Sequence, residues 1–342
     1  MNLQPEFKNI YFAREALQQL QKILRESKDA PLGVLCDHHT EKHCWPLLQN
    51  SLPELRKLSP YVVKAGEESK SLTTLDGVWQ AMGQMKMDRH SLLLNLGGGV
   101  ITDLGGMAAS TYLRGISYVN MPTSLLAMAD ASVGGKTGIN FQGGKNRIGT
   151  FAQPLMVGIL PQFLDTLPEE EFKSGAAEML KHGLIRDADH FWRLVELLSE
   201  GQPPGTEELQ ATVAIKAAVV DQDPYEKGLR ALLNFGHTVG HALESALAGT
   251  ERSLSHGRAV ALGMMTALRL SVEHCGLPPM EGRKAYEALS RVYIWPPGPV
   301  PDWQELYPRM QADKKNKGGQ LQMVLLRQLG EAVARQEVPE EE

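Results

Sequence analysis

The chain has 342 residues, a formal net charge of −5 and a charged fraction of 22%. A chain longer than about 300 residues usually folds as two domains, because one hydrophobic core stops growing below that size. The acidic balance argues against a general nucleic-acid-binding protein, which needs a concentrated basic face. It leaves room for a local basic pocket that holds one small anion.

The cysteines Cys36, Cys44 and Cys275 form neither a CxxC pair nor an even framework, so we expect free thiols in a reducing compartment. The N-terminal residues show no basic segment followed by an apolar one, which predicts no signal peptide. Apolar runs stay well short of the ~18 residues that a membrane helix needs. Together these features predict a cytoplasmic protein that binds no membrane.

The first part of the chain alternates predicted helices and strands. Apolar residues at helical spacing predict helices, and short apolar runs predict strands. The helices fall at 13–26, 73–87 and 101–112, and the strands at 32–36, 60–64, 91–96 and 116–121. Such alternation predicts a mainly parallel sheet covered by helices, that is, an α/β, Rossmann-like nucleotide-binding domain over residues 1–155.

From about residue 168 long helical patterns dominate. They fall at 168–185, 187–200, 206–222, 229–248 and 257–275. We therefore expect an all-helical domain over residues 156–342 that binds metal and substrate. Active sites favour the cleft between two such domains.

A glycine-rich turn, Gly97-Gly98-Gly99, follows the strand predicted at 91–96 and opens a helix. In that setting backbone N–H groups approach a pyrophosphate at the positive end of the helix. The spacing is not GxGxxG, so a tight turn, with Gly105 and Gly106 allowing close helix packing, is an equally good interpretation.

Residues 130–146 contain two Gly-Gly-Lys units, which end at Lys136 and Lys145. Glycine pairs permit close backbone approach and lysines supply positive charge, so we expect phosphate-binding loops here. The P-loop motif GxxxxGK[ST] is absent. The alternative is a glycine-rich surface loop with solvated lysines.

His237 and His241 are four residues apart in NFGHTVGH and share one face of the predicted helix. This spacing is compatible with two zinc ligands, as in HExxH metalloproteases, but Thr238 stands where such a protease needs its glutamate base. His256 and Glu178 are further candidates, since a catalytic metal needs three protein ligands and an open position. Paired helical histidines are also common without metal. The small residues around these histidines suggest a cavity wall.

Taken in order, the motifs resemble the 3-dehydroquinate synthase family of sugar-phosphate cyclases. The resemblance covers about residues 66–330, and the combination is specific although each motif alone is weak. The motifs are GGGVITDLGG, YLRG, MPTSLLAMADASVGGKTG, GGKNRIGTFAQP, TLPEEEFKSGAAEMLKHGLI, GLRALLNFGHTVGHALE and LSHG.

The resemblance implies that 3-deoxy-D-arabino-heptulosonate 7-phosphate is converted to 3-dehydroquinate and phosphate, a step of the shikimate pathway to the aromatic amino acids. The implied steps are transient oxidation by NAD, phosphate elimination, re-reduction, ring opening and intramolecular aldol closure, with a metal acting as Lewis acid. NAD then shows no net turnover. The implied partner is a phosphorylated sugar acid, not a nucleic acid.

The resemblance also implies site residues. One divalent metal, zinc or cobalt, would be held by Glu178, His237 and His256, with His241 as a substrate-contacting or proton-handling residue. The other substrate contacts would be Asp130, Lys136, Asn146, Lys181, Lys216, Arg230, Asn234 and Lys314. NAD contacts would come from Asp37 (as the ribose-binding acid), Glu67, Lys70, Gly98, Gly99, Asp103, Thr123, Ser124, Lys136, Lys145 and Thr166. Arg114 in YLRG resembles an arginine that reaches into the neighbouring subunit's site, which implies a homodimer.

Four positions depart from the family pattern, and none removes an implied metal ligand. Thr102 stands for a glycine, Ser124 for a second threonine, His39 for a residue that is often asparagine, and Arg258 for an acid. We expect His39 to alter NAD affinity and Arg258 to lower metal affinity.

Three alternatives remain on sequence grounds. A sister cyclase would make a deoxyinosose or valiolone-type ring, but the cations and amide at Lys181, Asn234 and Lys314 favour a substrate with a carboxylate. A metal-dependent NAD alcohol or glycerol dehydrogenase would need fewer cations and would accumulate NADH. A non-catalytic NAD-binding protein is the third alternative, and the complete ligand set disfavours it.

Overall fold

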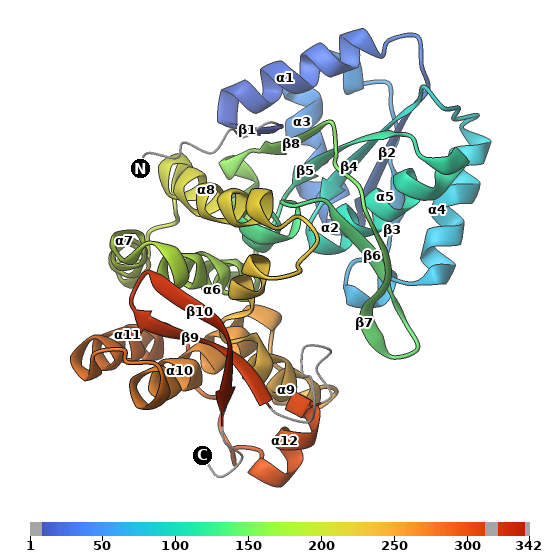
Figure 1. Ribbon diagram of the computed structural model, residues 1–342. Helices are drawn as coiled ribbons and strands as arrows, with labels where there is room; N and C mark the ends of the chain where they lie inside the picture. The colour runs from blue at the N-terminus through green and yellow to red at the C-terminus, as the bar shows by residue number, and fades with distance from the viewer. Residues whose placement is uncertain (1–8, 312–320, 339–342) are drawn as a thin grey trace. The chain divides into compact units, whose positions relative to one another are not determined.

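The computed structural model describes residues 9–311 and 321–338. The chain divides into two compact units, Met1–Pro168 and Glu169–Glu342 (Figure 1). The first unit is α/β and the second is mainly helical, so the predicted fold class is confirmed. The strand β8 (Met156–Ile159) lies beyond residue 155 but pairs with β1 and β5 of the first unit, which therefore extends past the domain boundary expected from the sequence.

A six-stranded parallel sheet forms the centre of the first unit, in the order β1-β8-β5-β4-β2-β3. The remaining strands are β1 (Ile10–Phe12), β2 (Leu32–Asp37), β3 (Tyr61–Val63), β4 (Leu92–Gly97) and β5 (Ser117–Pro122). From β2 the chain passes to β3, which pairs with β2 on one side. It then crosses back to β4, which pairs with β2 on the other side and is followed by β5. The carboxyl ends of β2 and β4 thus flank a topological switch point, the place where open α/β sheets bind ligands.

Helices cover the sheet. Every residue of β4 is buried, as expected for a parallel strand packed on both faces. One hydrophobic cluster joins strand residues such as Leu35 and Leu93 to Val78 of α4 and Leu104 of α5, and α1 packs against β8. The helices are α1 (Ala13–Glu26), α2 (His38–His43), α3 (Trp45–Ser51), α4 (Leu72–Gln84) and α5 (Gly99–Thr111), with short turns η1 (Pro53–Leu55), η2 (Glu67–Ser69), η3 (Tyr112–Arg114), η4 (Ala127–Ala131) and η5 (Pro161–Thr166).

Two glycines of α5 permit close packing. A Cβ on Gly105 would lie 1.9 Å from Oδ1 of Asn95 on β4, and one on Gly106 would lie 2.6 Å from Cγ2 of Thr137. Asn95 in turn donates to Oδ1 of Asn120 on β5 (2.9 Å). The structure therefore supports the packing interpretation for Gly105 and Gly106.

The two Gly-Gly-Lys units do not form one loop. They stand at opposite ends of an antiparallel hairpin, β6 (Lys136–Phe141) and β7 (Gly144–Phe151). Lys136 begins β6, whereas Lys145 follows Gly144, the partner of Phe141 at the far end. At about 3.4 Å per residue, the two lysine backbones lie roughly 15 Å apart. Alternating residues such as Thr137 and Ile139 pack inward and make the segment between the two units a strand, so the phosphate-binding role of each lysine stays a prediction.

The second unit is built on two buried helices, α6 and α10. Every residue of α6 from Ser174 to Ile185 is buried. The helix packs against α7, α8 and α10. The helices are α6 (Glu169–Arg186), α7 (Ala188–Ser199), α8 (Thr206–Gln222), α9 (His237–Leu247), α10 (His256–His274), α11 (Pro279–Val292) and α12 (Trp303–Gln311), with a turn η6 (Leu229–Asn234).

A two-stranded sheet, β9 (Leu321–Gln328) and β10 (Glu331–Val338), adds to these helices. The all-helical unit expected from the sequence is therefore wrong in this respect. The strand β9 packs on α10, where the backbone N–H of Leu326 donates to Oγ of buried Ser271 (2.9 Å). No described helix is both long and apolar enough to cross a membrane.

Glycines bring α9 and α10 into close contact. A Cβ on Gly263 would lie 1.9 Å from the carbonyl oxygen of Gly236, and one on Gly240 would lie 3.0 Å from the carbonyl oxygen of Ala259. Gly236 has a φ of 78°, in the left-handed region, at the residue before α9. The glycines of NFGHTVGH therefore face α10. The cavity wall expected from the sequence is wrong at these positions.

We predict that Gly263→Ala lowers the free energy of unfolding by about 1–3 kcal/mol or more, because the new methyl group collides with backbone that cannot rotate away. Urea unfolding followed by fluorescence measures the change. Gly83→Ala in α4 is the matched control, because its Cβ would make only ordinary contact (3.9 Å). Helix propensity predicts that this control is neutral or slightly stabilising. Equal stability of the two variants would contradict the packing assignment.

His190 predicts a pH dependence of stability. Its side chain is 2% exposed, its Nε2 lies 2.8 Å from Oγ1 of Thr212, and burial lowers its pKa from 6.5 to about 4. Between these values the unfolded chain binds a proton that the folded chain does not, so stability falls as the pH drops from 6.5 toward 4. We expect a loss of about 2 kcal/mol from this group between pH 7 and pH 5.

Urea unfolding of the wild type and of His190→Gln at both pH values tests this. The variant should keep a polar contact to Thr212 and lose much of the pH-dependent decrease. An unchanged decrease in the variant would assign the pH dependence to other groups.

Candidate functional site

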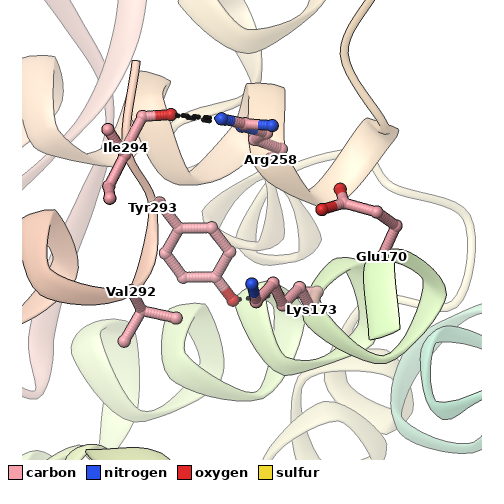
Figure 2. A pocket seen from close by; sticks show the side chains of 6 residues that line it. All are labelled: Glu170, Lys173, Arg258, Val292, Tyr293 and Ile294. Carbon is pink, nitrogen blue, oxygen red and sulfur yellow. Dashed lines mark hydrogen bonds between the residues drawn. The ribbon is translucent and has the colours of Figure 1, made fainter. Parts of the chain in front are cut away.

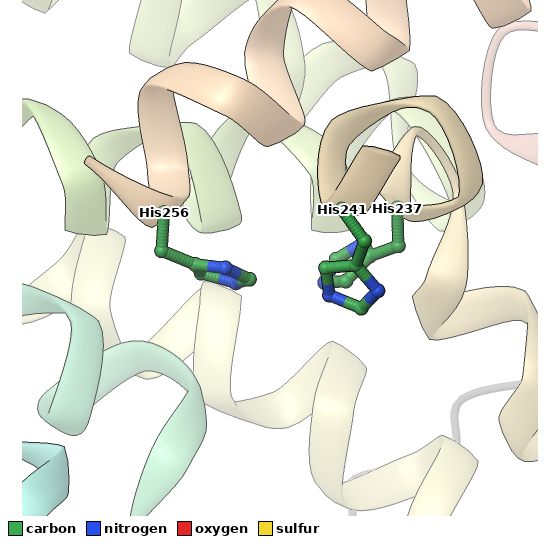
Figure 3. Close-up of side chains that lie close together, drawn as sticks. All are labelled: His237, His241 and His256. Atoms are coloured by element: carbon green, nitrogen blue, oxygen red, sulfur yellow. The ribbon is translucent and has the colours of Figure 1, made fainter. Parts of the chain in front are cut away.

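Three histidines of the second unit converge. His237 and His241 extend from α9 and His256 from the first turn of α10, and Figure 3 shows the three rings gathered together. Nitrogen atoms from all three lie within 4.8 Å of one another. The ring centroids are separated by 5.2 Å for His237–His241 and 5.4 Å for His237–His256. His237 and His241 therefore lie on one face of α9, as their i,i+4 spacing predicted.

Glu178 of α6 completes the cluster. Its side chain is fully buried, and its Oε1 lies 3.6 Å from Nε2 of His237 and 3.7 Å from Nε2 of His256. Contact between α6 and α10 explains this approach, because the backbone N–H of Gly257 donates to Oγ of Ser174 (3.0 Å), one turn before Glu178. A Cβ on Gly257 would lie 2.1 Å from the carbonyl oxygen of Ser174.

In two of these rings Nδ1, the nitrogen that does not face Glu178, lies at hydrogen-bond distance from an oxygen. Nδ1 of His237 lies 3.2 Å from the carbonyl oxygen of Phe235, and Nδ1 of His256 lies 3.3 Å from Oε2 of Glu244. Both acceptors favour a proton on Nδ1, which leaves Nε2, the nitrogen that faces Glu178, as the atom of each ring that would bind a metal. Two imidazoles and one carboxylate that converge in this way form a donor set suited to zinc or a similar divalent ion.

Burial and the charges of the cluster shift two histidine pKa values in opposite directions. Burial, followed by the charge of Lys181, holds the pKa of His237 well below its usual value. Burial also lowers the pKa of His256, but hydrogen bonds and charges from Glu178 and Glu244 outweigh it and raise the pKa to about 9. Lys181 forms a buried hydrogen bond and ion pair with Glu178.

Three of the predicted substrate-binding cations are buried in this unit. The exposed fractions are 1% for Lys181 on α6, 5% for Lys216 on α8 and 2% for Arg230 on η6. Burial of a cation costs several kcal/mol unless the charge is paired, and Lys181 is paired with Glu178.

The segment that carries Arg230 is anchored by an acid that sequence reasoning missed. The carboxylate of Asp223 accepts the backbone N–H groups of Lys227, Gly228 and Arg230 at 2.7–3.0 Å, which lowers the pKa of Asp223. Nη1 of Arg230 donates to the carbonyl oxygen of Pro224 (2.7 Å). The available signal was an acid followed directly by proline at the end of a predicted helix.

Asn234 ends this segment. Its Nδ2 donates to Oε1 of Glu226 (3.2 Å) and to the carbonyl oxygen of Ala231 (3.1 Å). The side-chain amide is therefore oriented by a neighbouring acid that the sequence analysis had not singled out.

The guanidinium group of Arg258 binds the segment after α11. Its Nε and Nη2 donate to the carbonyl oxygen of Ile294 at 3.2 Å and 2.6 Å (Figure 2). It lines a cavity of about 90 Å³ together with Glu170, Lys173 and Tyr293. The expectation that Arg258 lowers metal affinity thus receives no support from its placement, because its guanidinium is committed to the segment after α11.

In the first unit, the glycine-rich turn joins β4 to α5. Gly98 is the N-cap residue of α5, and a Cβ there would lie 3.2 Å from Oγ of Ser124, while one on Gly99 would lie 3.3 Å from Cβ of Ala131. The backbone N–H of Thr123 donates to the carbonyl oxygen of Gly97 (3.0 Å). The turns after β4 and β5, both predicted to bind NAD, are therefore packed together at the carboxyl edge of the sheet.

A second group of predicted NAD contacts is held together by ion pairs. Nζ of buried Lys70 lies 2.6 Å from Oδ2 of Asp103 on α5 and 4.0 Å from Oε1 of Glu67. Asn140 of β6, which the sequence analysis missed, donates from Nδ2 to Oε1 of Glu67 (2.8 Å). Its Oδ1 accepts the backbone N–H of Asn146 (2.9 Å), so the Lys145 end of the hairpin joins this group.

Asp37 has a structural task at the end of β2. Its Oδ1 accepts the backbone N–H groups of His39 (2.9 Å) and Thr40 (3.0 Å), so the side chain caps α2. The side chain of His39 is exposed. Thr102 is buried and bonds the carbonyl oxygen of Gly99 (3.2 Å). Thr166 is exposed at the end of η5.

Two further predicted residues occupy unusual backbone. Asp130 lies in η4, a single π-helical turn, a feature that is frequent at functional sites. Arg114 has a φ of 70° and follows Leu113 with a φ of 51°. Consecutive left-handed residues other than glycine cost about 1–2 kcal/mol each. The predicted substrate residue Lys314 lies outside the described residues.

Comparison with known proteins identifies the family. The family model for the 3-dehydroquinate synthase N-terminal domain matches residues 60–174, and that for the C-terminal domain matches residues 175–316. The 3-dehydroquinate synthase of Parabacteroides distasonis is 39% identical over 341 residues, covering 97% of this chain and 94% of the relative. That of Gloeobacter violaceus is 45% identical over 288 residues, covering 82% and 78%.

Solved structures agree in fold. A 2-deoxy-scyllo-inosose synthase in complex with carbaglucose-6-phosphate, NAD⁺ and Co²⁺ superposes with a TM-score of 0.86 at 22% identity, covering 97% of this chain and 94% of the other. ValA, a 2-epi-5-epi-valiolone synthase from Streptomyces hygroscopicus with NAD⁺ and Zn²⁺ bound, gives 0.82 at 27% identity, covering 97% and 93%. Two matched family models and near full-length relatives at 39% identity and above decide the assignment: the chain belongs to the 3-dehydroquinate synthase family.

Proposed function

We propose that the residues described above carry out the reaction of this family, with the cluster of Glu178, His237 and His256 as its metal site. The enzyme is a 3-dehydroquinate synthase, which converts 3-deoxy-D-arabino-heptulosonate 7-phosphate to 3-dehydroquinate and phosphate. The single observation that carries the site assignment is the approach of two Nε2 atoms to one buried carboxylate oxygen.

Sequence identity favours this reaction over that of the sister cyclases. The matched relatives named 3-dehydroquinate synthase are 36–45% identical to the chain, whereas the inosose and valiolone synthases of known structure are 22–27% identical. An iron-containing alcohol dehydrogenase shares only the fold, with a TM-score of 0.64 at 14% identity.

The proposed metal site uses residues whose placement fits a divalent ion. When bound, the metal would supply a Lewis acid and NAD would supply a hydride acceptor that is regenerated within each cycle. ValA binds NAD⁺ and Zn²⁺, and the inosose synthase binds NAD⁺ and Co²⁺, which supports the same pair of cofactors here. We assign Glu178, His237 and His256 as ligands, since the Nε2 atoms of both histidines face the carboxylate of Glu178.

We assign the buried cations to the substrate. A phosphate and a carboxylate on one molecule need several positive charges, and Arg230 offers a planar fork whereas Lys181 and Lys216 act as point charges. Arg230 is held by its bonds to Asp223 and Pro224, so little side-chain entropy remains to be lost on binding. We assign Asn234 and His241 to the substrate hydroxyl groups, with Asp130, Lys136, Asn146 and Lys314 as further contacts.

The switch point of the parallel sheet supports an NAD site in the first unit. The N-terminal end of α5 offers backbone N–H groups at Gly98 and Gly99 for a pyrophosphate. Asp103 lies on the same helix and forms an ion pair with Lys70. Lys70 in turn pairs with Glu67 of the turn η2. We retain Thr123, Ser124, Lys145 and Thr166 as proposed contacts. We retain Asp37 as the proposed ribose contact. Both of its helix-capping bonds go to Oδ1, so we assign this contact to Oδ2.

We further propose a cytoplasmic homodimer. Cys36, Cys44 and Cys275 are free, which suits a reducing compartment. Arg114 is exposed on strained backbone, and strain of that kind is retained where a residue must point in one direction. These observations support the proposal that Arg114 serves the neighbouring subunit.

Phosphate release tests the proposed reaction. With the heptulosonate phosphate, NAD and zinc or cobalt, the protein should release phosphate with no net change in NADH absorbance, because the hydride returns to the substrate. Chelation should abolish release, and added metal should restore it. Steady NADH accumulation would instead indicate a dehydrogenase. A heptulose phosphate that lacks the carboxylate is the matched control and should react much more slowly.

Substitution of the histidines separates ligand from substrate contact. His237→Ala should lose bound metal, because it removes one of three ligands. His241→Ala should retain metal but turn over at least about 100-fold more slowly, as expected when a proton-handling group is lost. Metal content by atomic emission and single-turnover kinetics measure the two effects. Equal loss of metal in both variants would show that His241 is also a ligand.

A further inference from the structure

We propose that Glu244 is a positioning residue of the metal site: it holds the imidazole of His256 so that Nε2 is presented to the metal. The family motifs named His256 as a ligand but assigned no role to Glu244. The inference rests on the metal site of the proposed function and adds a residue to it. It is carried by the 3.3 Å contact between Oε2 of Glu244 and Nδ1 of His256.

The two nitrogens of the His256 ring face two different carboxylates. Nδ1 faces Glu244 of α9, whereas Nε2 lies 3.7 Å from Oε1 of Glu178 of α6. A carboxylate behind Nδ1 keeps the proton on that nitrogen and leaves the Nε2 lone pair for a metal. Carboxylate–histidine–metal arrangements of this kind fix the ring and raise the basicity of the ligand.

For the ring of His256, the side chain of Glu244 provides the hydrogen-bond acceptor that a backbone carbonyl provides for the ring of His237. His237 uses the carbonyl oxygen of Phe235, two residues away, so its orientation follows from the turn before α9. His256 instead depends on a side chain twelve residues earlier, across the segment between α9 and α10. The tautomer of His256, unlike that of His237, should therefore be sensitive to one substitution.

The start of α10 makes this support necessary. His256 is the first residue of α10, and the N-cap residue Ser255 makes no side-chain capping hydrogen bond. The backbone of the next residue, Gly257, is fixed by Ser174, but that bond does not set the rotation of the His256 ring. The side chains of His256 and Glu244 are 30% and 18% exposed, so the contact is partly shielded from water.

The test compares metal affinity in Glu244→Ala, Glu244→Gln and the wild type, by competition of zinc and cobalt with a chromophoric chelator. Loss of such a partner typically weakens metal binding 10–100-fold, which is the expected result for Glu244→Ala. Glu244→Gln keeps an acceptor oxygen but loses the charge, and should fall between the two. Glu273→Ala, which removes an exposed ion pair with Arg269 on α10, is the matched control and should bind metal like the wild type.

Two measurements separate positioning from general destabilisation. Thermal unfolding of the metal-free proteins should show similar midpoints for Glu244→Ala and the control, while the rise in midpoint on adding metal should shrink for Glu244→Ala alone. An undiminished rise in midpoint for Glu244→Ala on adding metal would overturn the proposal.

Long-range ¹H–¹⁵N spectra of histidine in the wild-type protein, with His256→Gln for assignment, test the tautomer without altering Glu244. The metal-bound protein should show a proton on Nδ1 and coordination by Nε2 of His256. Coordination through Nδ1, or an affinity of Glu244→Ala within twofold of the wild type, would also overturn the proposal. A wild-type protein that binds no metal would instead refute the metal site itself.

Discussion

Glu178 is the residue on which the arrangement of the second unit depends. Its carboxylate is fully buried on α6, and a buried charge is tolerated only where other groups compensate it. Lys181, one turn later, forms an ion pair with it, and two histidine nitrogens face it at 3.6–3.7 Å. Such a pair of charges contributes little net stability, since desolvation offsets attraction. The divalent ion proposed for this site would add a further compensating charge beside the same oxygen.

The packing of three helices delivers the histidines to that carboxylate. Glycines at 236, 240 and 263 let α9 and α10 approach closely, and Gly257 lets the start of α10 rest on Ser174 of α6. The donor atoms are thus positioned by contacts that leave no room for one additional methyl group. Precision of this kind is what a catalytic site needs, because ligands held by rigid helices lose little entropy when they bind.

Periodicity predicted the elements that tertiary contacts reinforce. The helices at 13–26 and 206–222 and the strand at 32–36 were found within one residue of their observed ends, because each carries one clear apolar pattern. The predicted helix 229–248 is instead divided into η6 and α9 by the left-handed Gly236. No local signal reports that division, because glycine inside a helical pattern is ambiguous.

Side-chain partners were less predictable than the site residues themselves. The family motifs named Glu67, Lys70 and Asp103, but the contact of Asn140 with Glu67 depends on the register of β6 and β7. Similarly, Asp223 is recognisable as an anchor only once its three backbone donors are in place. Such contacts join residues that are distant in sequence or depend on loop geometry, so the sequence shows at most a local signal, such as the proline after Asp223, and not the partners themselves.

The fold alone does not select the reaction. Alcohol and glycerol dehydrogenases with 13–15% identity share this architecture at TM-scores of 0.54–0.64. Function must then follow from the groups that the scaffold carries. Here the scaffold buries Lys181, Lys216 and Arg230 in the same unit as the histidine cluster. Three buried cations favour the proposed assignment to a substrate that carries both a phosphate and a carboxylate over a neutral alcohol, which offers no charge for them to bind.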